Sequence, residues 1–492
     1  MRKLGFDSKK YEKLTTKEIL KRSKSFNNKL YLEIGGKLFD DYHASRVLPG
    51  FKYDAKIEIL KKLKNKLEVI ICISAKDIER NKIRADFNIT YEKDLMRLID
   101  KIRKNGLSIN SVVITLFDNQ QSVLKLRNKL ELNNIKVYLH TFTKGYPTDI
   151  DKIVSEEGYG ANPYIETSKE LVVVTAPGPS SGKLATCLSQ LYHEYKRGIK
   201  AGYAKLETFP TWNLPLKHPV NIAYEAATAD LKDVNMIDPF HMEAYNEIAV
   251  NYNRDIEVYP ILRNILRKIT NDDIYKSPTD MGINMTGYCI KNDDVVIKAC
   301  YDEIIRRYLK ALVEYKRGNA KKDTCERIKL LMNELDLNID DRKVVRYAKK
   351  KEEQKNAYAM AIELSNGKII TGRKTDYMSP AASTVLNALK SLAKLDMDVD
   401  IISSVVLEPM LNMKKNLFDK SILDLKEILL ALSINEVTNP IIDKVLEQIP
   451  KLEHCEAHIT CIPSSSDDIT LKKLGINYTC DPIERNNELF ND

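Results

Sequence analysis

The sequence lacks a long apolar run, a paired-cysteine motif and a secretory signal, and each absence excludes a class of protein. No apolar run reaches the roughly 18 residues that a membrane-spanning helix needs. The first residues, MRKLGFDSKKYEKL, are polar and have no apolar core of a signal peptide. The eight cysteines are scattered without any CxxC, a pattern typical of reduced structural cysteines. We therefore expect a cytoplasmic protein that neither enters a membrane nor depends on disulfides or zinc.

The sequence also lacks a concentrated charge of one sign. Lysine and arginine number 78 against 69 aspartates and glutamates, a formal excess of +9 that is spread through runs such as KKLKNK. Such runs are typical of solvated faces, whereas nucleic-acid binding requires a clustered basic stripe with interleaved aromatic residues. We therefore exclude nucleic acid as a partner and expect a small anionic or phosphorylated ligand, which a mild positive field suits.

Length and patterning predict an α/β protein in two parts. The 492 residues exceed one ordinary core, and short buried-strand patterns alternate with helical ones, which indicates a parallel sheet. Strands are expected at 30–34, 68–74, 111–117, 135–142 and 171–174. The strongly charged stretch 342–356 is a candidate linker, because strand and helix patterns restart after it. This division gives a large N-terminal region, 1–345, that is mainly helical from about 235, and a C-terminal α/β domain, 346–492.

Residues 171–197 resemble a phosphate-binding loop in which two of the usual residues are missing. In the motif G-x-x-x-x-G-K-[ST], Pro177 stands at the first glycine, and Leu184 stands where a hydroxyl would ligate Mg²⁺. Backbone N–H groups and the following helix N-terminus can still attract phosphate. The expected ligand-binding residues of this loop are Gly178, Ser180, Ser181, Gly182 and Lys183. A nucleotide with Mg²⁺ is one cofactor that would suit it, and a tight strand-to-helix turn without a ligand is the alternative.

The sequence predicts no metal site. With Leu184 in the motif, the hydroxyl of Ser180, Ser181 or Thr186 would have to hold a Mg²⁺ ion bound at the loop. The pair His454 and His458 falls in an expected strand, where residues four apart are separated by roughly 13 Å.

Three further loops carry polar side chains, of which the first two suit orientation and proton transfer at an anionic substrate and the third resembles another anion-binding loop. They are GGKLFDDYHASRVLPG, KLETFPTWNLPLKHPVN and ITGRKTDYMSPAAS, and the polar segment around Asp255 is a further candidate pocket lining. The expected catalytic residues are Asp41, His43, Lys205 and Glu207, and the expected ligand-binding residues are Lys37, Arg46, Trp212, His218 and Arg373. The alternatives are a salt-linked loop for the first segment and a packed lid or core position for Trp212.

Several long motifs in order carry a resemblance to a known family. GGKLFDDYHASRVLPGF, VVVTAPGPSSGKLATCLSQLYHE, GYAKLETFPTWNLPLKHPVNIAYEAATADL, NMIDPFH and YKSPTDMG resemble the bacterial uncharacterised protein family 0371, also called domain of unknown function 1846. The resemblance implies a large N-terminal region and a smaller α/β C-terminal domain, and it implies that Leu184 is a family trait. It supplies no activity and no catalytic residues.

Two functional hypotheses follow. The first is a cytoplasmic enzyme, a nucleotide- or phosphate-dependent transferase or hydrolase, in which the 178–183 loop holds phosphate. The second is a non-catalytic ligand-binding or assembly protein, including a homo-oligomer, with the fold of a nucleotide enzyme.

Overall fold

The computed structural model describes residues 3–84, 89–418, 421–437 and 439–484. The chain divides into two compact units, which we treat separately. The larger unit consists of Leu4–Glu225 and Asp233–Cys300, and the smaller unit consists mainly of the chain from Tyr301 onward.

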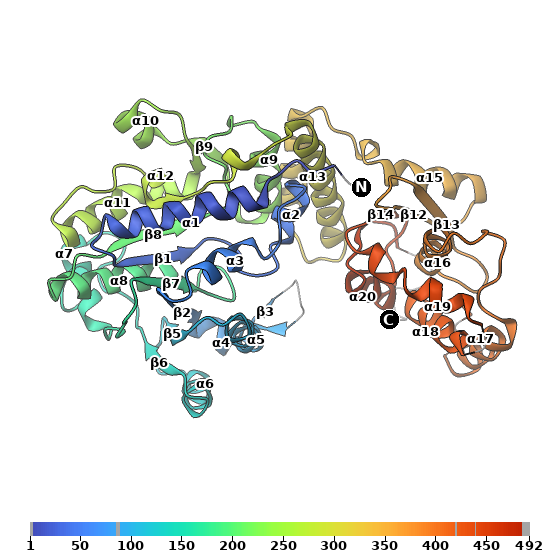
Figure 1. Ribbon diagram of the computed structural model, residues 1–492, viewed down its shortest axis with the longest axis horizontal. Helices are drawn as coiled ribbons and strands as arrows, with labels where there is room; N and C mark the ends of the chain where they lie inside the picture. Colours follow the sequence, from blue (N-terminus) through green and yellow to red (C-terminus); the bar gives the residue numbers. More distant parts are fainter. Residues whose placement is uncertain (1–2, 85–88, 419–420, 438, 485–492) are drawn as a thin grey trace. The chain divides into compact units, whose positions relative to one another are not determined.

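A seven-stranded parallel sheet forms the centre of the larger unit, as the sequence predicts (Figure 1). The strands in spatial order are β11 (Gly282–Ile283), β8 (Gly202–Leu206), β1 (Leu30–Ile34), β7 (Leu171–Thr175), β2 (Leu67–Ser74), β5 (Ile109–Thr115) and β6 (Lys136–Leu139). The residues of β1, β2 and β7 are all buried, which explains their nearly continuous apolar sequences.

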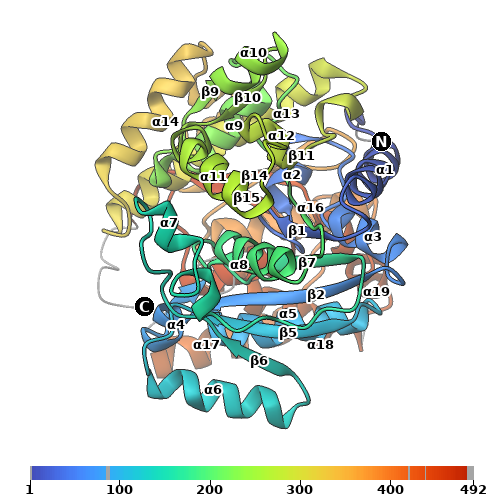
Figure 2. The same ribbon diagram turned by 90° about the vertical axis from the view of Figure 1, so that its left-hand side faces the viewer.

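Helices cover both faces of this sheet. Side chains alternate along β1, so Tyr31 and Glu33 point to one face, where they contact α8 (Lys183–Lys196). Leu30 points to the other face, and its neighbour Gly202 on β8 packs against the ring of Phe26, which follows α1. Figure 2 shows α8 running beside β7.

The remaining elements of the larger unit connect these strands. The helices are α1 (Ser8–Lys24), α2 (Tyr42–Val47), α3 (Ala55–Lys62), α4 (Ala75–Glu79), α5 (Tyr91–Lys104), α6 (Gln121–Leu132), α7 (Ile150–Ile153), α9 (Pro219–Ala227), α10 (Pro239–Tyr245), α11 (Asn253–Thr270) and α12 (Pro278–Met281). Two short antiparallel pairs are β3 (Ile83–Arg84) with β4 (Ile89–Thr90) and β9 (Asn235–Ile237) with β10 (Val250–Tyr252). Helix α13 (Asp293–Lys316) runs from the larger into the smaller unit.

The smaller unit contains a four-stranded mixed sheet with its own apolar core. Its order is β13 (Ile369–Arg373), β12 (Ala359–Glu363), β14 (Glu456–Ile459) and β15 (Asn477–Cys480), with only the last pair parallel. The helices are α14 (Lys322–Glu334), α15 (Lys343–Lys355), α16 (Pro380–Leu392), α17 (Ser404–Phe418), α18 (Leu425–Glu436), α19 (Ile441–Leu446) and α20 (Ser465–Lys473).

The candidate linker 342–356 contains helix α15, which packs on strands β12, β13 and β14. Arg342, just before this helix, is 1% exposed and donates to Ala457 O and Asn477 O of the neighbouring strands. A domain boundary near residue 345 stays a prediction, which limited proteolysis would test. Among the described helices, none has both the length and the apolar character required to cross a bilayer.

Candidate functional site

The loops that follow β1, β7 and β8 meet at one edge of the sheet, because adjacent parallel strands place their carboxyl ends side by side. Ligands of open α/β sheets bind outside this edge. The loop after β7, residues 176–182, is the one that resembles a phosphate-binding loop, and it leads directly into α8.

The loop after β7 has the backbone of a tight strand-to-helix turn. Ser180 and Gly182 adopt left-handed φ angles of 55° and 80°, and Gly182 is the N-cap of α8. The amide of Thr186 donates to Gly182 O at 2.9 Å, and no hydrogen-bond partner is found for the amides of residues 182–185 in this described segment. The preceding N–H groups at the helix start therefore keep their donor capacity, as expected at a helix N-terminus.

Both glycines of the loop also have a packing role. A Cβ at Gly178 would lie 2.0 Å from the ring of Tyr91, and one at Gly182 would lie 2.8 Å from the Thr115 side chain. The Ser181 and Thr186 hydroxyls, expected as replacement metal ligands, are buried and donate to backbone carbonyls of the loop.

A buried carboxylate lies beside the lysine of this loop. Lys183 Nζ is 3.8 Å from Glu33 Oε1, and the two side chains are 14% and 9% exposed. Glu33 also accepts a hydrogen bond from the Tyr203 hydroxyl at 2.8 Å. Glu33 is therefore the ion-pair partner of Lys183, the lysine that the sequence analysis expects to bind phosphate.

A second group of charges adjoins Glu33 on the same face. Lys205, the register partner of Glu33 on β8, lies 2.6 Å from Glu207 Oε1 and 3.0 Å from Asp255 Oδ2 at the start of α11. The structure therefore brings the predicted residues Lys183, Lys205 and Glu207 to one sheet edge, together with Glu33 and Asp255. We call these five residues the charged cluster.

The environment of the charged cluster shifts the pKa of two of its members. Burial raises the pKa of Glu207 to about 7, against the attraction of Lys205, and the carboxylates of Asp255 and Glu33 push it in the same direction as burial. Burial alone would lower the pKa of Lys205, but Asp255, Glu207 and Glu33 outweigh this and hold it well above its usual value. The cluster thus pairs a permanent cation with a carboxyl group that titrates near neutral pH.

The predicted residues of the loop after β1 have structural partners. Asp41 lies 3.2 Å from the buried Lys56 and accepts a hydrogen bond from Ala44 N at the start of α2. Lys56 also donates to Gly35 O and to the carbonyl of Lys37. The salt-linked loop that the sequence left as an alternative is therefore present.

Two other predicted residues of this segment lie on α2. The ring of His43 packs edge-on against Phe209 and Tyr224, with centroids 5.2 and 5.4 Å away. Arg46 is half-buried in the last turn of the helix.

Trp212 borders the charged cluster, whereas His218 and Arg373 have other surroundings. A Cβ at Gly282 would lie 2.5 Å from the Trp212 ring and 3.6 Å from Glu207 Oε2. The His218 ring lies 3.1 Å from Asp293 and accepts from the amide of Val220, so it organises the start of α9. Arg373 ends β13 in the smaller unit and donates to Lys374 O.

Comparison with known proteins agrees with the resemblance seen in the motifs. A family model described as domain of unknown function DUF1846, N-terminal, matches residues 4–336, and its C-terminal counterpart matches residues 340–490. The chain belongs to the DUF1846 family. A UPF0371 protein of Clostridium botulinum strain Eklund 17B is 56% identical, and one of Clostridium tetani is 57% identical, each over 99% of both chains. Neither the family description nor these names states an activity.

The family assignment identifies neither a ligand nor a metal. Among the described residues, no three His, Cys, Asp or Glu side chains are grouped as they would be to hold a metal ion. All eight cysteines are buried thiols.

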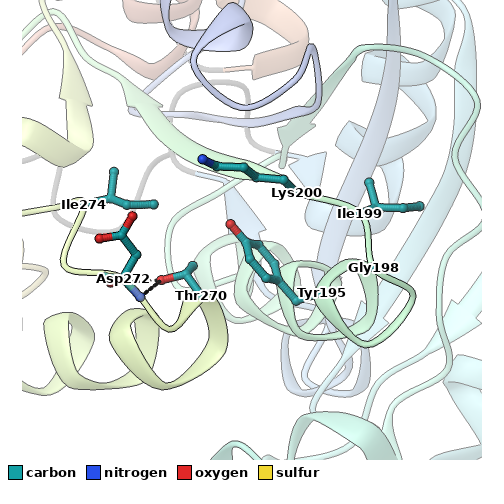
Figure 3. Close-up of a pocket in the computed structure, with 7 residues that line it drawn as sticks. All are labelled: Tyr195, Gly198, Ile199, Lys200, Thr270, Asp272 and Ile274. Carbon is teal, nitrogen blue, oxygen red and sulfur yellow. Dashed lines mark hydrogen bonds between the residues drawn. The ribbon is translucent and has the colours of Figure 1, made fainter.

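A small hollow lies away from the charged cluster, near the amino end of β8. Its volume is about 250 Å³, and Tyr195, Gly198, Ile199, Lys200, Thr270, Asp272 and Ile274 line it (Figure 3). Four of these residues belong to the end of α8 opposite to Lys183, roughly 20 Å along the helix, and to the loop after it, and the other three lie at the end of α11 or just after it. The hollow contains none of the predicted site residues. The candidate site is therefore the carboxyl edge of the seven-stranded sheet, where the charged cluster lies.

Proposed function

We propose that the carboxyl edge of the seven-stranded sheet binds a small phosphorylated or nucleotide ligand and that the protein acts on it as an enzyme. The observation that carries this proposal is the junction of β7 and α8. Amide groups at the start of a 14-residue helix keep their donor capacity there, beside the charged cluster. Such a helix start favours an anion through its N–H groups and its partial positive charge.

Each residue of the site then has a chemical role. The backbone of 180–184 and the ammonium of Lys183 contact the phosphate. Lys205 neutralises developing negative charge, and Glu207 transfers a proton. A carboxyl group with a pKa of about 7 suits proton transfer, because catalytic efficiency is greatest when the pKa lies near the operating pH. The eight reduced cysteines suit the cytoplasmic location that we also propose.

A non-catalytic binding protein is the second candidate, and one observation favours it. The close packing around Gly178 and Gly182 explains these glycines without a ligand. The hydroxyls of Ser181 and Thr186 donate to backbone carbonyls of the loop. A loop retained for packing would bind ligand without turnover. Product formation from a bound phosphate ligand would decide for the enzyme.

Calorimetric titration with ATP, AMP, glucose 6-phosphate and pyrophosphate, with and without Mg²⁺, tests the proposal. Lys183→Ala should weaken the affinity by about 10- to 150-fold, because a charge-assisted hydrogen bond contributes roughly 1.5–3 kcal/mol. The matched control is Lys200→Ala, which removes an exposed lysine at the other end of the sheet. If every ligand binds Lys183→Ala as tightly as the wild type, the loop is only a turn and the proposal fails.

Leu184→Ser separates phosphate binding from metal binding. The substitution restores the hydroxyl of a usual P-loop but leaves the amides of the loop unchanged. We expect the affinity without metal to stay within about twofold of the wild type, well under the tenfold that corresponds to 1.4 kcal/mol.

A further inference from the structure

Glu33 holds the position on Lys183 that a ligand phosphate would take. It is a buried carboxylate within an otherwise apolar central strand, and its Oε1 lies 3.8 Å from the ammonium of Lys183. The Tyr203 hydroxyl fixes its second oxygen. A phosphate group that contacts Lys183 must therefore compete with Glu33.

The charged cluster has no surplus of positive charge with which to receive a dianion. It contains two ammonium groups and three carboxylates, so its formal charge is −1 when all five residues are ionised. When a phosphate dianion pairs with Lys183, Glu33 loses its counter-ion. The carboxylates of Glu33, Glu207 and Asp255 then share Lys205 as the remaining cation of the cluster. Repulsion among carboxylates in a partly buried site is relieved when one of them binds a proton.

We propose that Glu33 is an internal competitor for Lys183, and that exchange of Glu33 for a ligand phosphate draws a proton into the charged cluster at Glu207. This inference rests on the proposed function and adds its coupling to protons. It makes Glu33 a positioning residue that acts through Lys183. Ligand affinity would consequently fall as the pH rises above neutrality.

Glu207 is the member of the cluster best placed to take the proton. It is 8% exposed, and a Cβ at either Gly35 or Gly282 would lie within 4 Å of its side chain, so it is closely enclosed. The titratable and charged groups that face it are Lys205 and Tyr203 of β8, Glu33 of β1, Tyr224 of α9, Tyr252 of β10 and Asp255 of α11. The three tyrosines stay neutral at pH 8, because burial raises the pKa of each, so the carboxylates of Glu33 and Asp255 supply the repulsion that proton uptake at Glu207 relieves.

The experiment is calorimetric titration of the full chain with ATP, AMP and glucose 6-phosphate at pH 8. Terminal phosphates, with a second pKa of about 6, are already dianionic at this pH. Titrations in buffers of different ionisation enthalpy give the number of protons taken up. The wild type should take up about 0.5–1 proton per ligand, by the linkage between binding and protonation.

Variants separate the two parts of the inference. Glu33→Gln should tighten binding by about 3- to 10-fold, because it removes the competitor that keeps Lys183 occupied. Glu207→Gln should bind at least as tightly as the wild type but take up almost no proton. Glu257→Gln, which removes an exposed carboxylate of α11, is the matched control and should behave like the wild type.

The outcomes distinguish this inference from the proposed function. If the wild type binds a phosphate ligand without proton uptake, or if Glu33→Gln fails to tighten binding, the exchange is overturned while the proposed function stands. If neither these three ligands nor pyrophosphate binds, both are overturned.

Discussion

The two ends of the seven-stranded sheet contain similar groups of side chains. At the carboxyl end, Glu33 accepts from the Tyr203 hydroxyl at 2.8 Å and lies 3.8 Å from Lys183. At the amino end, Glu194 accepts from the Tyr31 hydroxyl at 2.7 Å and lies 3.8 Å from a lysine, Lys29. Each end thus places a buried carboxylate between a tyrosine and a lysine.

The surroundings of the two carboxylates differ. The side chain of Glu194 is 0% exposed, Tyr164 donates to the same oxygen, and Gln190 donates to the Tyr31 hydroxyl. Glu33 is joined by the other members of the charged cluster, of which Asp255 is 36% exposed. The same chemistry therefore forms a closed structural network at one end and a cluster open to solvent at the other, where a ligand could displace an ion pair.

The largest expected effect is on stability at the amino end. Glu194→Ala removes the fully buried carboxylate that pairs with Lys29 and accepts from the hydroxyls of Tyr31 and Tyr164, so we expect it to lower the free energy of unfolding by about 3–5 kcal/mol. Glu33→Ala should lower it by less, about 1–2 kcal/mol, since the loss of Glu33 also relieves its repulsion with Glu207. Urea denaturation of both variants measures this difference, and equal losses would contradict the contrast between the two ends.

A pH-dependent effect at Glu207 is the next largest. Its pKa is about 7 in the folded protein, against 4.5 for an unperturbed glutamate, so the folded state binds more protons between these values and stability falls as the pH rises from 4.5 to 7. Glu207→Gln removes this penalty. It should stabilise the protein by about 3 kcal/mol at pH 8 and leave stability unchanged at pH 4, at 1.36 kcal/mol per pKa unit. A stabilisation that does not depend on pH would show that Glu207 titrates normally.

The smallest expected effect is on ligand affinity when Lys29, the amino-end counterpart of Lys183, is replaced. Lys29→Met should leave affinity for phosphate ligands within about twofold of the wild type, because Lys29 belongs to the closed network. Loss of ligand affinity in this variant would mean that the amino end contributes to binding.

Apolar patterning predicts the central strands but not the charged cluster. The runs that become β1, β2 and β7 are apolar because both of their faces are buried, so the prediction of a parallel sheet is confirmed. The expected strand 135–142 is shorter, spanning only Lys136–Leu139, because it is an edge strand whose pairing with β5 covers only these residues.

Glu33 is the member of the charged cluster that the sequence analysis does not predict. A charge within an apolar strand, just before Gly35, was the signal available. Its meaning depends on the pairing of β1 with β8, which brings Lys205 from 172 positions away beside it. A catalytic role for Asp41 and His43 stays a prediction, and their partners in the structure, Lys56 and the ring of Phe209, are ones that local sequence does not reveal.

The crystal structure of the protein bound to its tightest phosphate ligand tests the central claim most directly. We predict a phosphate within hydrogen-bond distance of the 181–184 amides and of Lys183 Nζ, with Glu33 turned away from that lysine. A phosphate bound elsewhere, such as in the hollow beside Tyr195 and Lys200, with the Lys183–Glu33 pair intact, would contradict the account.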